Sequence, residues 1–373
     1  MTIDGLSSSR VVQPETIEDL AKLISNEKGA IVPVGAGTQL GFGNPLARAD
    51  CAVDLTKLSR ITEYVPADLT IHVEAGVTLQ QLHHTLLENK QFLPLDPWNG
   101  PAATIGGIAA ANAQGPFRAA GTIRDWIIGM TVVEASGKIS KSGGRVVKNV
   151  TGYDLHKLYT GSLGTLAVIA EISLKLRANF ERTATVIARF VDTKSAAACL
   201  GLLRKSALQP VACEWVGPEN EIWLRFGEQA RAVDWQLKNL PAGGDWVVKE
   251  GGEESSAWEG LRKRYNGFEG VVVRAVGLPT QVHEIIEEYR PAEWIAHALN
   301  GIVLMRLNSP GEIRRIREKF RAVIEKAPID VRREIPTFGL TPAEHEMMKK
   351  MKAAFDPEGR LNPGRHVDGE YAG

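Results

Sequence analysis

Glycine and other small residues are concentrated between Thr104 and Leu176, in a stretch that ends in a regular apolar strand. Small side chains let a ligand approach the backbone closely, and glycine supplies backbone angles that other residues resist. Such a surface ahead of regular strands suits a large, flat cofactor that carries phosphate. Each Gly-Gly pair by itself favours a tight turn in an ordinary α/β protein, so this prediction depends on the stretch as a whole.

A second candidate for ligand binding is the loop at residues 35–39, directly after a predicted buried strand at residues 30–34. Successive backbone amides in such a turn form a concavity that binds anions and suits a pyrophosphate. The spacing departs from the Rossmann pattern G-x-G-x-x-G, because the third glycine, Gly41, comes one position late and no clear helix follows. A non-Rossmann pyrophosphate loop and a plain turn both stay open, and Asp54 alone supports a nicotinamide-dependent Rossmann dehydrogenase.

The elements that must position these segments differ between the two parts of the chain. Residues 1–55 predict a β-α-β unit followed by a further strand. Later strands of this part are predicted at residues 69–75, 126–134 and 165–176. From about residue 180, mixed β-α-β-β units predict an α+β domain with helices on one face of an antiparallel sheet. There we interpret residues 251–256 as a flexible turn and residues 311–326 as one helix.

Composition excludes several classes of protein. The chain has 373 residues, of which 44% are hydrophobic and 24% charged, and this is an ordinary globular composition that allows two to three domains. Lys+Arg and Asp+Glu are both 44, which argues against nucleic acid as the main partner. The three cysteines form no CxxC pair, so this chain predicts neither a zinc site nor an iron–sulfur cluster of its own. We expect no secretory signal, no membrane-spanning segment and a cytoplasmic location.

Several motifs and the tail carry a resemblance to a known family. The motifs occupy residues 33–38 (PVGAGT), 73–78 (VEAGVT), 104–107 (TIGG), 121–125 (GTIRD), 148–154 (KNVTGYD) and 161–166 (GSLGTL). The tail motif is FDPEGRLNPG at residues 355–364. On these residues the chain resembles the flavoproteins of the vanillyl-alcohol oxidase type, with a PCMH-type FAD-binding domain, and the tail is similar to the D-lactate and glycolate dehydrogenase branch.

The resemblance implies an α+β protein with three parts. These are a two-subdomain FAD-binding domain at residues 1–178, a cap at residues 179–335 and a C-terminal segment at residues 336–373 that packs back on the FAD domain. It also implies the FAD-binding subunit of a glycolate oxidase type complex, which oxidises 2-hydroxy acids such as glycolate or D-lactate by hydride transfer to the flavin. The implied partners are a second FAD subunit and an iron–sulfur subunit, with peripheral attachment to the inner membrane through the complex. The alternative is a non-catalytic structural or electron-relay subunit that binds FAD beside a catalytic homologue.

The resemblance also implies which residues hold the cofactor. Backbone amides at Gly35, Ala36, Gly37, Thr38 and Gln39 would bind the pyrophosphate. The phosphate and flavin would be lined by Thr104, Ile105, Gly106, Gly107, Ala111, Asn112, Gly121, Thr122, Ile123 and Arg124. Val168 and Ile169 would place backbone groups near the adenine or the ring edge. Members that attach flavin covalently often carry a histidine in the pyrophosphate loop, where this chain has Ala36 or Thr38, so we expect non-covalent FAD.

The chain departs from the family pattern in two places. In the usual G-S-E-G-T-L-G motif, Leu163 replaces the glutamate and Ala167 the last glycine. In the cap, catalytic relatives carry H-x-G-x-G-N-x-H, whereas here His297 is present and the second histidine is Leu304. One histidine is too few for a metal site, so no metal is expected. His297 stays a candidate general base, and a histidine satisfied within the fold is an equally good interpretation.

A 2-hydroxy acid substrate would also need a cation for its carboxylate. The candidates on predicted cap strands are Arg225, Arg274 and Arg306.

Overall fold

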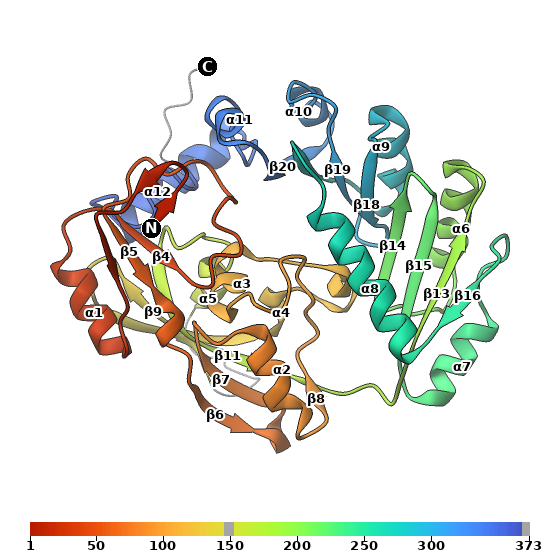
Figure 1. Ribbon diagram of the computed structural model, residues 1–373, viewed down its shortest axis with the longest axis horizontal. Coiled ribbons are helices and arrows are strands. Elements are labelled where there is room, and N and C mark those ends of the chain that lie inside the picture. The colour runs from red at the N-terminus through yellow and green to blue at the C-terminus, as the bar shows by residue number, and fades with distance from the viewer. Residues whose placement is uncertain (145–152, 368–373) are drawn as a thin grey trace. The chain divides into compact units, whose positions relative to one another are not determined.

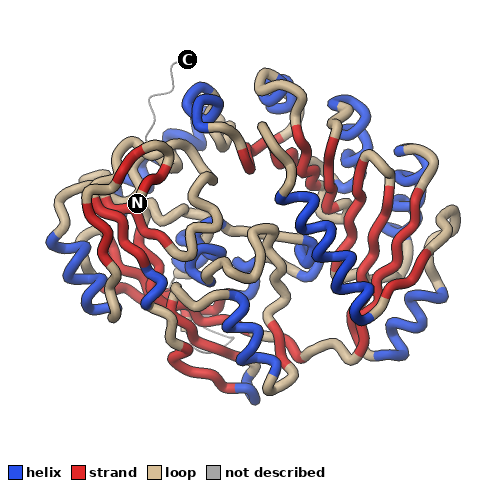
Figure 2. Tube along the Cα trace, in the orientation of Figure 1, coloured by secondary structure: helices blue, strands red, loops and turns tan. Residues whose placement is uncertain are grey.

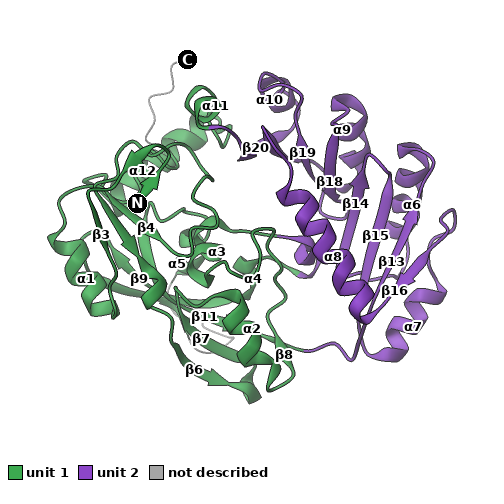
Figure 3. Ribbon diagram, viewed as in Figure 1, with its two compact units in different colours: residues 1–114, 121–178, 329–373 green, residues 115–120, 179–328 purple. Residues whose placement is uncertain are grey.

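The computed structural model describes residues 1–144 and 153–367. Most of the motif at residues 148–154 lies outside the described residues. The chain divides into two compact units, shown in Figure 3. Unit 1 contains residues 1–114, 121–178 and 329–373, and unit 2 contains residues 115–120 and 179–328. The domain boundaries predicted from the sequence differ from these units in two respects. The tail returns to unit 1 at residue 329 instead of 336, and the short segment 115–120 belongs to the cap unit instead of the FAD domain.

The first part of unit 1 is a small parallel sheet in the order β3-β5-β4. Its elements are β3 (Arg10–Val12), α1 (Ile17–Asn26), β4 (Ile31–Val34) and β5 (Cys51–Asp54), after a hairpin of β1 (Thr2–Ile3) and β2 (Leu6–Ser7). Helix α1 begins where the Thr16 hydroxyl accepts a hydrogen bond from the Asp19 amide, and it buries Leu20 and Ile24 completely. The predicted β-α-β unit is confirmed.

The second part of unit 1 is an antiparallel sheet in the order β10-β9-β11-β7-β6 (Figure 1). Its strands are β6 (Ile61–Val65), β7 (Thr70–Glu74), β9 (Ile127–Glu134), β10 (Ile139–Gly143) and β11 (Ala167–Lys175). The helices of this part are α2 (Leu79–Leu87), α3 (Ile105–Ala111), α4 (Ile123–Trp126) and α5 (Leu155–Tyr159), and β8 (Gln91–Phe92) pairs with β12 (Arg177–Ala178). One apolar core joins the sheet to these helices, with Leu82, Ile105 and Ile172 fully buried.

The tail contains α11 (Ile329–Glu334) and α12 (Pro342–Phe355) and then joins β4, where Ile31 exchanges backbone hydrogen bonds with Arg360 and Asn362. The Arg360 guanidinium donates to the carbonyls of Ile24 and Glu27 at the end of α1, and to that of Ala135. A cation is favoured at a helix C-terminus, where carbonyls lack intrahelical partners. These contacts hold residues 360–362 in the first domain.

Unit 2 is an eight-stranded antiparallel sheet, visible as the larger group of strands in Figure 2. Its order is β16 (Val247–Lys249), β13 (Arg182–Arg189), β15 (Glu221–Glu228), β14 (Ala212–Gly217), β18 (Glu293–His297), β19 (Ile302–Arg306), β17 (Val272–Val276) and β20 (Arg321–Lys326). The helices are α6 (Thr193–Lys205), α7 (Ala230–Lys238), α8 (Gly251–Asn266), α9 (Val282–Tyr289) and α10 (Glu312–Arg317).

Helices cover both faces of this sheet, whereas the sequence predicted one. Trp215 stacks on His283 of α9, and Trp223 packs on Trp258 of α8. Trp223 lies opposite Glu214 in the ladder, and adjacent residues of a strand point to opposite faces, so α8 and α9 lie on different sides.

Two predicted elements of the cap are wrong. Residues 251–256 begin α8 instead of forming a turn, because the buried Glu254 carboxylate accepts hydrogen bonds from Thr183, Thr185 and Arg225. The predicted helix at 311–326 ends at Arg317, and β20 then pairs with β17 at the edge of the sheet. Tertiary contacts override local preference at both places.

The buried ammonium of Lys352 gives a direct test of how the tail is held. It donates to the carbonyls of Thr165 (2.9 Å) and Leu361 (2.7 Å) and to the Asp356 carboxylate (2.6 Å). Replacing Lys352 with Met leaves the carboxylate buried without its cation, so we expect the free energy of unfolding in urea to fall by about 3 kcal/mol. Lys350→Met removes an exposed pair with Glu346 and should change it little. Equal losses in the two variants would contradict this account of the tail.

Candidate cofactor-binding site

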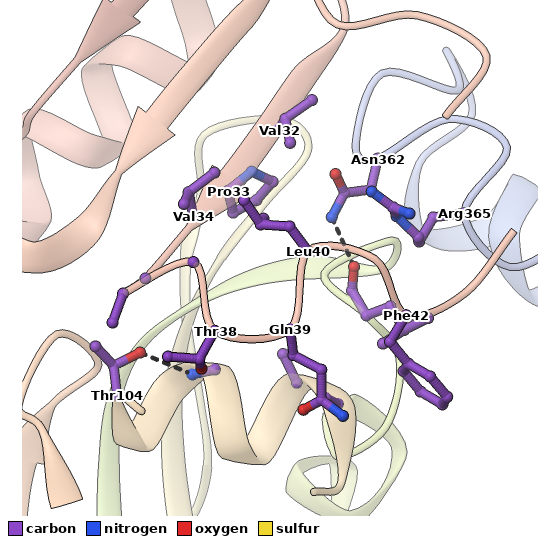
Figure 4. A pocket seen from close by; sticks show the side chains of 17 residues that line it. Val32, Pro33, Val34, Thr38, Gln39, Leu40, Phe42, Thr104, Asn362 and Arg365 are labelled. Carbon is purple, nitrogen blue, oxygen red and sulfur yellow. Dashed lines mark hydrogen bonds between the residues drawn. The ribbon is translucent and has the colours of Figure 1, made fainter. Parts of the chain in front are cut away.

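The loop at residues 35–39 follows β4 directly and approaches α3 more closely than any side chain would allow. A Cβ atom added at Gly35 would lie 2.2 Å from the hydroxyl oxygen of Thr104. Gly37 has φ +73°, in the left-handed region that favours glycine. Both positions therefore require glycine, for space at the first and for backbone angle at the second. Figure 4 shows this loop above the start of α3.

Helix α3 is itself held close to the sheet. Thr104 is its N-cap, and its hydroxyl accepts a hydrogen bond from the Gly107 amide at 3.2 Å. A Cβ atom at Gly106 would lie 2.6 Å from that of Ala75, which directly follows β7. The small residues of this stretch therefore bring backbone against backbone, and the loop and the helix together form one wall of small residues.

Two cavities with a shared lining lie along this wall. Both are open to solvent, and together they extend from the loop at residues 35–39 along α3 to Val168 and Ile169 of β11. Of the predicted cofactor residues, those that line one or both cavities are Gly35, Ala36, Gly37, Thr38, Gln39, Thr104, Gly106, Gly107, Ala111, Val168 and Ile169.

The remaining predicted cofactor residues all belong to the described part of the chain, and they do not line either of these two cavities. The side chains of Ile105 and Ile123 are fully buried in the apolar core. Asn112 ends α3 with a left-handed backbone, and its side-chain oxygen accepts a hydrogen bond from Gln114. Gly121, Thr122 and Arg124 lie at the start of the short helix α4. Sequence spacing alone did not show which members of each motif line the cavities.

The tail supplies lining residues that sequence reasoning did not assign to the site. Asn362 has φ +43° and lines both cavities, and its amide nitrogen donates to the carbonyl of Leu163 at 2.7 Å. Arg365 lines the first cavity. The matching tail motif was visible in the sequence, and only its pairing with β4 shows that it reaches the site.

The lining fits a dinucleotide that carries phosphate. Among the described residues, the buried side-chain oxygens of Gln39 and Asn362 accept no hydrogen bond. Buried polar atoms are nearly always hydrogen-bonded, so unpaired acceptors in a cavity point to donors on a ligand, such as ribose hydroxyls or an adenine amino group. The loop amides and the Arg365 cation suit a diphosphate.

The cap contains a buried ionisable pair. Glu214 and His297 are opposite each other on β14 and β18, and the imidazole Nδ1 lies 2.7 Å from the Glu214 carboxylate. The two side chains are 0% and 3% exposed. Burial raises the pKa of Glu214 well above its usual range, and the nearby Arg118 opposes that rise. Arg118 belongs to the short 3₁₀ helix η3 (Pro116–Ala120), which contacts β14 and β18.

The three arginines predicted as carboxylate-binding candidates are ion-paired within the cap. Arg225 contacts Glu254 at 2.7 Å, Arg274 contacts Glu325 at 3.0 Å and Arg306 contacts Glu293 at 2.6 Å. The positions of these arginines on strands were predicted correctly, but the sequence cannot show which acidic residue lies opposite each of them.

Within residues 1–144 and 153–367, no three His, Cys, Asp or Glu residues come together as a metal site. No helix in those residues has the length and apolarity needed to cross a membrane.

Comparison with known proteins places the chain among flavoproteins. Residues 8–143 match the family model described as an FAD binding domain, and residues 337–366 match the C-terminal domain of FAD linked oxidases. The fold is similar to that of alkyldihydroxyacetonephosphate synthase, with a TM-score of 0.68 at 16% identity, over 95% of this chain and 76% of that one. The first part of the chain is therefore similar to an FAD binding domain and the tail to the C-terminal domain of FAD linked oxidases, and both matches indicate FAD as the cofactor.

The chain is also similar to several curated dehydrogenases and oxidase subunits. The chain is 36% identical to the cytochrome-type D-lactate dehydrogenase of Arabidopsis thaliana over 50% of its length and 33% of that protein. It is 31% identical to glycolate oxidase subunit GlcE of Escherichia coli, over 64% of this chain and 61% of the relative. It is 24% identical to glycolate oxidase subunit GlcD of Bacillus subtilis, over 95% and 88%. The chain thus spans a third of the first relative and under two thirds of the second.

The close approach at Gly35 can be tested by adding one methyl group. Gly35→Ala places a Cβ against Thr104, so the loop must move away from α3, and we expect FAD affinity to fall by about tenfold or more. Gly41→Ala is the matched control, because no atom lies within 4 Å of its Cβ. Flavin absorbance per protein during titration of stripped protein with FAD measures both. Unchanged affinity in Gly35→Ala would show that this wall does not hold the cofactor.

Proposed function

We propose that this chain is the FAD-binding subunit of a glycolate oxidase type complex, which oxidises small 2-hydroxy acids such as glycolate or D-lactate. The observation that carries the proposal is the FAD domain together with relatives that act on this class of substrate. These include both glycolate oxidase subunits and the D-2-hydroxyglutarate dehydrogenase of Stutzerimonas stutzeri, 24% identical over 96% of this chain and 90% of that protein.

When bound, FAD would supply the hydride acceptor, and the protein supplies binding and orientation. The amides at residues 35–39 would hold its diphosphate, and the wall from Thr104 to Gly107 would exclude water from it. Ala36 and Thr38 offer no nucleophile of the kind that covalent members carry, so the cofactor should be bound without a covalent link. Treatment with acid should then release the flavin into the supernatant.

In the cap, we propose that His297 accepts the proton of the substrate hydroxyl. The Glu214 carboxyl group lies 2.7 Å from Nδ1 and so fixes the orientation of the imidazole ring. Both residues belong to unit 2.

A non-catalytic role is favoured by a separate observation. Leu304 stands where catalytic relatives carry a second histidine, and the ring of His297 is 97% buried against Glu214. On this alternative the chain binds FAD as a structural or electron-relay subunit, and a homologue oxidises the substrate.

The proposed partners are a second FAD subunit and an iron–sulfur subunit. Cys51, Cys199 and Cys213 are buried and scattered, so a cluster would lie outside this chain. The relative named as a glycolate oxidase subunit supports membership of a complex. A cytoplasmic location, with the complex attached peripherally to the inner membrane, remains a prediction.

Anaerobic reduction of the bound flavin distinguishes these possibilities. We expect glycolate or D-lactate to bleach the flavin absorbance of the purified chain in a stopped-flow experiment. Bleaching only in the presence of the partner subunits would support the non-catalytic alternative. If neither acid bleaches the flavin under either condition, the proposed function is wrong.

The raised pKa of Glu214 predicts how stability depends on pH. Above about pH 4.3 the unfolded carboxyl ionises while the buried one keeps its proton, so the wild type loses stability as pH rises toward the folded pKa. Glu214→Gln removes this loss, and we expect its melting temperature relative to wild type to increase with pH. Glu293→Gln, at a half-exposed ion pair with Arg306, is the control. Calorimetry at several pH values measures the effect, and a difference independent of pH would contradict it.

A further inference from the structure

Arg365 is a buried cation on the wall of the proposed diphosphate site. It lines the same cavity as the loop at residues 35–39, and Figure 4 shows it beside Asn362. Its side chain is only 5% exposed. A Cβ added at Gly43 would lie 2.7 Å from Cδ of Arg365, so the arginine side chain packs directly against the backbone there. Arg365 therefore brings a buried positive charge to the lining of this cavity.

The N-terminal hairpin holds this guanidinium in place. Nη1 of Arg365 donates to the Asp4 carboxylate at 2.8 Å and to the carbonyl of Asn44 at 3.1 Å. Asp4 lies at the turn of the β1–β2 hairpin, its side chain is 2% exposed, and it accepts a further hydrogen bond from Arg332 at 2.7 Å. Both described hydrogen bonds of Arg365 use Nη1, and a guanidinium has five N–H donors.

An anion would stabilise this arrangement. Burial and the neighbouring Arg332 lower the pKa of Arg365, so its charge is held under less favourable conditions than in water. Asp4 is shared between two guanidinium groups. A diphosphate in the adjoining cavity would supply negative charge where it is lacking, and planar guanidinium groups bind phosphate oxygens well.

We infer that Arg365 binds the diphosphate of FAD and that Asp4 acts as its positioning residue. The N-terminal hairpin and the tail would then close the cofactor site together. This inference does not depend on the substrate or on the identity of the partners, so it can fail while the proposed function stands.

The test compares ADP with adenosine, which differ only in the diphosphate. Calorimetric titration of the full chain, stripped of flavin, gives both affinities. In Arg365→Met we expect the ADP affinity to fall by about tenfold or more and the adenosine affinity to stay within about twofold. Parallel losses for both ligands would indicate a purely structural role, and unchanged ADP affinity would indicate no contact. Either result overturns the inference.

Arg332→Met is the matched control. Arg332 is buried and bound to the same carboxylate, but it does not line the cavity that Arg365 lines. Its loss should lower the melting temperature and leave the ratio of ADP to adenosine affinity within about twofold of wild type. If Arg365→Met does not fold, Arg365→Lys keeps the charge without the planar fork, and it should lower that ratio by about threefold. A ratio equal to that of wild type would contradict the contact.

Asp4→Asn tests the positioning role, because a positioning residue and a merely repelling charge would change the ADP affinity in opposite directions. Removing a negative charge near a phosphate should by itself tighten ADP binding. If Asp4 orients Arg365, its loss should instead weaken ADP binding, by about threefold, with adenosine unaffected. Tighter ADP binding would overturn the role assigned to Asp4.

Discussion

The contact between Gly35 and Thr104 is the constraint on which the cofactor site depends. Because no side chain fits at Gly35, the loop after β4 lies directly on the cap of α3. Because Gly106 is equally close to Ala75, α3 is held on the sheet behind it. Small residues at these positions bring three backbone segments together, and both cavities lie along the wall that these segments form.

Buried cations hold the tail against the first domain. Lys352, Arg360 and Arg365 all come from the last helix or the tail, and each donates to carbonyls or a carboxylate of another segment. Buried charges are tolerated only when such partners are present. The tail is therefore specified by long basic side chains whose partners lie far away in the sequence, and this explains how a short segment becomes part of the first domain.

Local patterns predicted the elements that carry a strong period or a cap. The strands at 69–75 and 126–134 and the first β-α-β unit follow from alternation, capping and apolar spacing. The motifs also located the loop and α3 at the site. Sequence did not reveal that residues 251–256 form a helix, because its cause is Glu254 buried against two threonines and Arg225 of neighbouring strands. The partners of the cap arginines and the role of Arg365 depend in the same way on contacts between distant residues.

The short segment at residues 115–120 limits how the protein can be taken apart. It belongs to the cap unit, although the residues on both sides of it belong to the FAD unit. The polypeptide thus passes between the units four times, after residues 114, 120, 178 and 328. A chimera that exchanged residues 179–328 alone would set a foreign sheet against a native 115–120 segment that packs on β14 and β18. Cap replacement in this protein therefore requires two coordinated exchanges rather than one.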